Sequence, residues 1–158
     1  MKERKIIMKF YNSKLRLAFL VAVIVGSVIL TGWAGSAFGI TKKDLRRVDD
    51  QGAVEVTVVY LNPLKQGDDS KLLFDVSMET HSVNLEAYKM QNISFVRFDD
   101  GKKKNALGWL KPGGGGHHIS GTLQFPGPIP DGAKSLQVVI EGIDGISQRV
   151  FEWKLPVE

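Results

Sequence analysis

Residues 53–61 read AVEVTVVYL and residues 71–80 read KLLFDVSMET. In both stretches every second residue is apolar, so the apolar side chains would line one face of a β-strand while Glu55 and Asp75 lie on the other. Residues 63–70, PLKQGDDS, separate the two stretches with turn-forming residues. The sequence therefore predicts two half-buried strands joined by a loop.

The same alternation continues toward the C-terminus and predicts further short strands, the first of them at a sheet edge. These strands are expected at residues 83–88, 92–98, 106–110, 117–125, 135–142 and 148–155. Residues 99–102, Asp-Asp-Gly-Lys, predict a tight hairpin whose returning strand is 106–110. The four glycines at 113–116 predict a break in the chain.

Seven or eight antiparallel strands with one apolar face each predict an all-β fold. Two packed sheets bury such faces best, so we expect an immunoglobulin-like antiparallel β-sandwich. A small β-barrel is the alternative, because a closed sheet also buries one face of each strand.

Residues 1–39 have the pattern of a cleavable signal peptide. Basic residues precede an apolar stretch at 17–35, and the small residues Ala37 and Gly39 fit the −3 and −1 positions of a cleavage site before Ile40. The apolar stretch approaches the ~20 residues of a membrane-spanning helix, so an uncleaved N-terminal anchor is the alternative. In both cases we expect an extracytoplasmic domain, either periplasmic or secreted, and a membrane contact only through a retained anchor.

The leader also accounts for the positive charge of the chain. Six of the 21 basic residues but only one of the 17 acidic residues precede Ile40, so residues 40–158 carry 15 basic and 16 acidic residues. The net charge of +4 is therefore no argument for a nucleic-acid partner, and we expect none. We expect a polar linker at residues 40–52, with too few apolar side chains to pack, followed by the β-sandwich domain at 53–158.

The residues best suited to chemistry are the three histidines, which occur in two short motifs, THS at 80–82 and GHH at 116–118. The chain has no cysteine, which excludes disulfides and thiolate ligands. Imidazoles with a carboxylate or water suit copper or zinc. We therefore predict a metal site formed by His81, His117 and His118, with Glu79 as an oxygen ligand.

Strand geometry restricts this site. Adjacent residues of a straight strand point to opposite faces, so His117 and His118 can bind one ion only if the strand begins with a turn or bulge. If strand 71–80 pairs with strand 117–125, His81 and His118 meet on one outer face with Glu79 beside them. In the alternative interpretation His81 caps a loop, His117 fills the rim of the core and His118 is solvated.

The function predicted from the sequence is that of an exported, non-enzymatic β-sandwich binding protein that holds copper or zinc. The rival hypothesis is a structural or protein-interaction module of the cell envelope, which has an envelope protein as partner and no metal site. An enzyme is not expected. Ser82 and Ser120 lie near histidines, but there is no nucleophile elbow and no acid is placed to orient a base.

Overall fold

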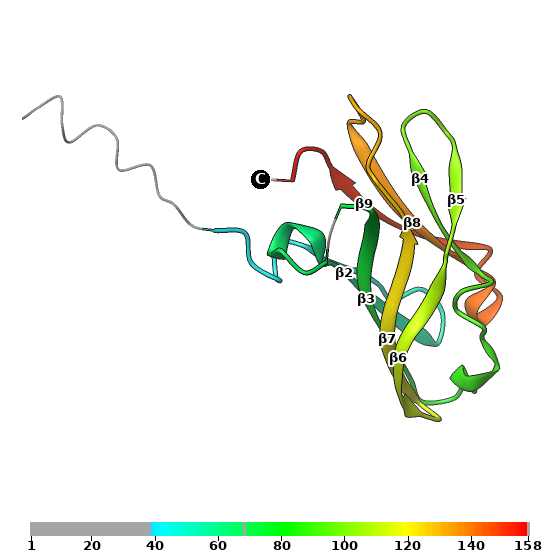
Figure 1. The fold of residues 1–158 in the computed structure, drawn as a ribbon. Helices are drawn as coiled ribbons and strands as arrows, with labels where there is room; N and C mark the ends of the chain where they lie inside the picture. The colour runs from blue at the N-terminus through cyan, green and yellow to red at the C-terminus, as the bar shows by residue number, and fades with distance from the viewer. Residues whose placement is uncertain (1–38, 68, 158) are drawn as a thin grey trace, which may run out of the picture. The chain divides into compact units, whose positions relative to one another are not determined.

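The computed structural model of the chain describes residues 39–67 and 69–157, which form two antiparallel β-sheets (Figure 1). The strand order is β1-β2-β3-β7-β6 in the five-stranded sheet and β5-β4-β8-β9 in the four-stranded sheet. The nine strands are β1 (Arg46–Asp49), β2 (Val54–Tyr60), β3 (Lys71–Thr80), β4 (Ser94–Phe98), β5 (Lys103–Asn105), β6 (Gly108–Gly115), β7 (His118–Pro126), β8 (Ser135–Glu141) and β9 (Gln148–Lys154). Three short 3-10 helices connect them, η1 (Asn62–Leu64), η2 (Leu85–Ala87) and η3 (Ile143–Gly145). The predicted all-β fold with two antiparallel sheets is confirmed.

The core contains the inward-facing residues of both sheets. In β2, β3 and β9 the buried side chains occupy every second position, as the alternation in the sequence predicts. Tyr60 and Phe74 stack with their ring centroids 4.9 Å apart, and the ring of Trp153 lies 5.4 Å from that of Phe74. These aromatic rings join the last strand to the centre of the five-stranded sheet.

The segment predicted as a polar linker is instead part of the domain, because it contains β1. Arg46 to Asp49 pair with β2 in antiparallel register, and the preceding Leu45 is completely buried. The indole N–H of Trp153 donates a hydrogen bond to the backbone oxygen of Leu45 at 2.9 Å. The buried leucine, its hydrogen bond with Trp153 and the pairing with β2 anchor the segment, while the charged residues of β1 lie at the sheet edge. Residues 40–158 together form one compact unit that contains all nine strands and the buried core.

Residues 106–110, predicted as the returning strand of the hairpin, instead carry the chain from the four-stranded sheet to the five-stranded sheet. The turn at residues 99–102 does form a hairpin, but the returning strand is β5 rather than 106–110. After β5, the backbone N–H of Leu107 donates to the oxygen of Gln124 in β7 at 2.6 Å, and β6 continues along β7 in the other sheet. The predicted strand therefore belongs to a different sheet from its expected partner.

Two further local predictions were wrong. Residues 83–88 form no edge strand but a connection that contains η2. The glycines 113–115 do not break the chain but form the last part of β6, after a bulge between Leu110 and Gly113 in which Lys111 has a φ of 49°. An edge strand accepts glycines and a bulge because only one of its sides must continue the hydrogen-bond ladder.

Most of the predicted signal peptide, residues 1–38, lies outside the described residues. In residues 39–67 and 69–157 the structure has no helix with the length and apolar character needed to cross a membrane.

Candidate functional site

Strand 71–80 pairs with strand 117–125, which was the condition for the predicted site, and the register places Glu79 directly opposite His118. The Nδ1 atom of His118 and the Oε2 atom of Glu79 are 4.0 Å apart. Both side chains are more than half exposed. Two ligands of one zinc ion each lie about 2 Å from it, so they can be at most about 4 Å apart. The separation between Glu79 and His118 is at that limit, which requires a linear arrangement. In a tetrahedral zinc site the two atoms would be about 3.3 Å apart, so the exposed side chains must move closer to share an ion.

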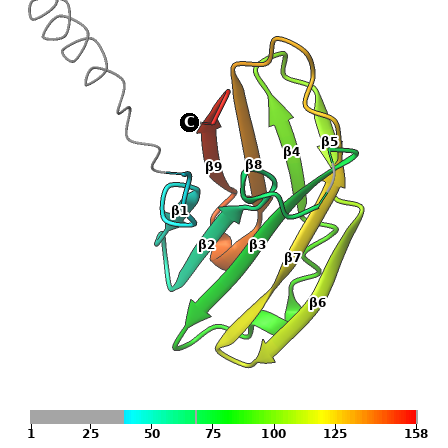
Figure 2. The same cartoon turned by 60° about the vertical axis from the view of Figure 1, so that its left-hand side comes forward.

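The other two histidines belong to the same end of the β3–β7 pair, which we call the histidine end. His81 directly follows β3, and His117 lies in the turn between β6 and β7. The backbone N–H of Thr80 donates to the oxygen of His117 at 3.0 Å, which continues the pairing by one residue beyond Glu79 and His118. Figure 2 shows the arrowhead of β3 and the β6–β7 turn at this common lower end.

The four predicted ligands do not form a finished coordination shell. Across the described residues, no three His, Asp or Glu side chains are arranged to hold one metal ion. Of the predicted set, the structure brings Glu79 and His118 together as a pair. His81 and His117 are exposed on the flanking segments, so their imidazoles are accessible to solvent at the histidine end.

The turn that carries His117 is positioned by glycine and by a carboxylate from η2. Gly114 has a φ of 82°, and a Cβ atom at this position would lie 2.1 Å from the backbone oxygen of His118. The backbone N–H of Gly116 donates to Oε1 of Glu86 at 3.2 Å. The backbone oxygen of Gly116 accepts from the N–H of Leu85 at 3.4 Å. The glycines therefore allow the tight reversal that brings His118 opposite Glu79.

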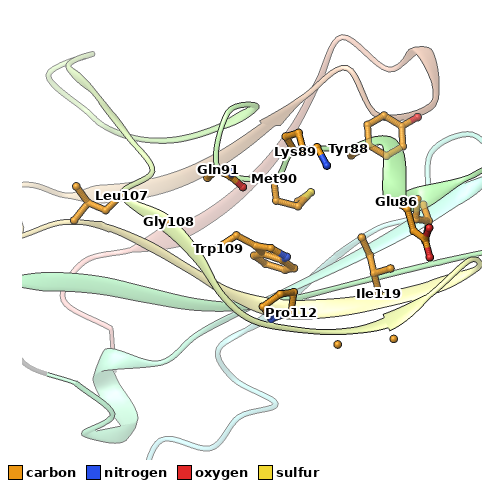
Figure 3. A pocket seen from close by; sticks show the side chains of 13 residues that line it. Glu86, Tyr88, Lys89, Met90, Gln91, Leu107, Gly108, Trp109, Pro112 and Ile119 are labelled. Carbon is orange, nitrogen blue, oxygen red and sulfur yellow. The ribbon is translucent and has the colours of Figure 1, made fainter.

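A second candidate site is a groove of about 560 Å³ between β6 and residues 85–91 (Figure 3). This volume is typical of small-molecule sites. Trp109, Met90 and Ile119 form its apolar part, and Glu86, Lys89 and Gln91 lie on its rim. The groove and the histidine end are connected through Glu86, which lines the groove and binds Gly116.

Trp109 is held in the groove by a glycine on the neighbouring strand. It lies opposite Leu123, with its side chain on the inner face of the sheet, and remains partly exposed. A Cβ atom on Gly121 would lie 2.7 Å from Cζ2 of Trp109, so only glycine leaves room for the indole. This groove was not predicted from the sequence. The signal for it is Trp109 near the start of a glycine-rich strand, with Gly121 on the neighbouring strand.

Comparisons with protein-family models, curated proteins and solved structures found no match to this chain. The inference of function therefore depends on the geometry of the chain itself.

Proposed function

We propose that this protein is a non-enzymatic, extracytoplasmic binding protein that captures copper(II) or zinc(II) at the histidine end. The ligands are His81, His117 and His118, and Glu79 supplies an oxygen. The observation that carries the proposal is the cross-strand pair of His118 and Glu79, whose donor atoms are 4.0 Å apart and exposed to solvent. The signal-peptide pattern of residues 1–39 supports the location.

The strand order supports an immunoglobulin-type sandwich as the scaffold. Without β1, the five-stranded sheet has the order β2-β3-β7-β6, which corresponds to strands A-B-E-D of that fold. The four-stranded order β5-β4-β8-β9 corresponds to C′-C-F-G. In this fold β3 and β7 are central neighbours, so they provide a rigid base for ligands at their ends.

The binding mechanism uses the exposure of the imidazoles. Because His81, His117 and His118 are exposed, their side chains can rotate toward an ion held first by the His118–Glu79 pair. Neutral imidazoles donate nitrogen lone pairs, and the carboxylate offsets part of the cation charge. Acid weakens this binding, because a protonated imidazole cannot be a ligand.

The test is calorimetric titration of residues 40–158, without a purification His-tag, with copper(II) and with zinc(II). We expect stoichiometric binding that is lost in the double variant His117→Ala/His118→Ala. Glu55→Gln is the matched control, because Glu55 lies opposite Glu79 on β2 and is not a proposed ligand. Absence of binding tighter than about 10 μM, roughly −7 kcal/mol, would refute the metal site.

A second candidate function is a protein-interaction module of the cell envelope. Two of the large apolar side chains with high exposure, Leu107 at 57% and Leu110 at 40%, lie at β6. Apolar side chains that gather at an edge strand favour contact with a partner. This hypothesis predicts a cross-linked envelope complex that is lost in Leu107→Asp but retained in Val150→Asp, since Val150 is exposed on the distant β9.

A further inference from the structure

The groove beside β6 combines an aromatic surface with a polar rim. Figure 3 shows Trp109 below Met90, with Ile119 to its right and the rim residues Glu86, Lys89 and Gln91 on segment 85–91. Met90 is buried and Ile119 is partly buried, so they form fixed walls beside the indole. The apolar part of the groove thus suits a flat ligand with C–H groups on one face.

The rim has both hydrogen-bond donors and hydrogen-bond acceptors. The ammonium of Lys89, the amide of Gln91 and the indole N–H of Trp109 have no hydrogen-bond partner within the described part of the chain. Glu86 uses Oε1 for Gly116 and has a second carboxylate oxygen. The rim therefore has free donors and free acceptors, and its one carboxylate offsets its one ammonium.

These features decide between classes of ligand. The opposite charges of Glu86 and Lys89 favour a neutral ligand over an ion, and the polar rim disfavours a purely apolar one. Addition of a peptide strand to the free edge of β6 is disfavoured. The backbone of Lys111 has a left-handed conformation, Pro112 has no N–H to donate, and a bulge interrupts the strand there. A sugar ring satisfies the remaining requirements, since it has an apolar C–H face and hydroxyls that both donate and accept.

We propose that this groove is a binding site for a short neutral glycan, with one sugar ring lying against Trp109 and its hydroxyls bonded to Gln91, Lys89 and Glu86. This site shares Glu86 with the turn that carries His117, but it uses none of the proposed metal ligands and does not depend on metal binding.

The proposal is tested by calorimetric titration of the full-length protein, in a detergent without sugar head groups, with maltotriose, cellotriose and tri-N-acetylchitotriose. We expect at least one of these neutral trisaccharides to bind with a Kd below about 5 mM. Trp109→Ala should weaken that binding by at least about tenfold, as expected for the central aromatic contact of a site.

Variants of the exposed rim residues test the same site without changing the packing of Trp109, in case Trp109→Ala disturbs folding. Gln91→Ala and Lys89→Ala change exposed side chains, and each should weaken binding by about threefold or more. Leu110→Ala is the control, because Leu110 is next to Trp109 but does not line the groove, and it should bind as the parent does. Failure of all three sugars to bind, or equal losses in Leu110→Ala and Gln91→Ala, would overturn the proposal.

Discussion

Arg149 on β9 forms an ion pair with Asp49 at the end of β1, and the Arg149 side chain is completely buried. A second nitrogen of the same guanidinium, Nη2, donates to the backbone oxygen of Gln51 at 2.5 Å. Its third nitrogen, Nε, is buried and has no hydrogen-bond partner among the described residues. Asp49 is therefore the carboxylate that compensates this buried charge, and the pair joins the first strand to the last.

Removal of the carboxylate should strongly destabilise the domain. We expect Asp49→Ala to lower the free energy of unfolding by about 3–5 kcal/mol, because it leaves the buried guanidinium uncompensated. Urea denaturation of residues 40–158 measures the change. The control is Glu55→Ala, which removes the partner of Arg46 in a half-exposed pair 3.8 Å apart and should cost at most about 1 kcal/mol. Similar losses in both variants would contradict this account of Arg149.

Leu45 should contribute as a core residue although it precedes β1 in a highly charged segment. Leu45→Ala should lower the free energy of unfolding by about 2–5 kcal/mol, the usual cost of truncating a buried leucine. Val48→Ala is the control on the same segment, because Val48 is 48% exposed, and it should change stability by no more than about 0.5 kcal/mol. If the two variants unfold at the same urea concentration, residues 40–52 are a linker after all.

Gly121 should be sensitive to the smallest added side chain. In Gly121→Ala the new Cβ would lie 2.7 Å from Trp109 and 3.0 Å from the oxygen of Leu110, so the indole must move. We expect a loss of about 1–3 kcal/mol, as for overpacking elsewhere, with a shift in tryptophan emission. Gly113→Ala provides the comparison, since its Cβ would meet only Ser120 Oγ at 4.0 Å. An unchanged emission spectrum in Gly121→Ala would refute the packing of Trp109 on Gly121.

Tyr60 should ionise only in strong alkali. Burial, together with the negative charge of Asp69, raises the pKa of Tyr60 from its ordinary value of 10.0 to about 12. The folded state thus holds the phenol proton more tightly than the unfolded state, so this contribution to stability is complete below pH 10 and is lost as the pH rises toward 12. Urea denaturation of the parent protein and of Tyr60→Phe across this pH range should show a steeper fall in the free energy of unfolding in the parent. If the free energy of unfolding falls equally with pH in both proteins, the raised pKa of Tyr60 is refuted.

The part of the fold that the sequence predicts is the part governed by the alternation of apolar and polar residues. β2, β3 and β9 have one buried face, and each of them shows the period of two in its sequence. β1 and β5 do not show this alternation, because they are short edge strands of mostly charged and polar residues. Their positions depend on contacts with distant strands, such as that of Leu45 with Trp153, which local pattern does not encode.

The histidine end and the groove also differ in how far the sequence predicts them. From the parity of the residues and one assumed strand pair, the sequence predicts that His81 and His118 meet with Glu79 beside them; in the structure it is Glu79 that lies opposite His118. The groove could not be predicted, since it depends on the crossing of the chain at Leu107 and on the space that Gly121 leaves for Trp109. Both are relations between segments that become neighbours only in the folded protein.

The contacts of β9 with the β1 segment join residues that are far apart in the sequence. Arg149 is 100 residues from Asp49, and Trp153 is 108 residues from Leu45. Closing such long loops costs conformational entropy, and a fold rich in contacts between distant residues is expected to form slowly. A chain without β9 would leave Leu45 without the indole that binds its backbone oxygen, so the first and the last strand of the domain depend on each other.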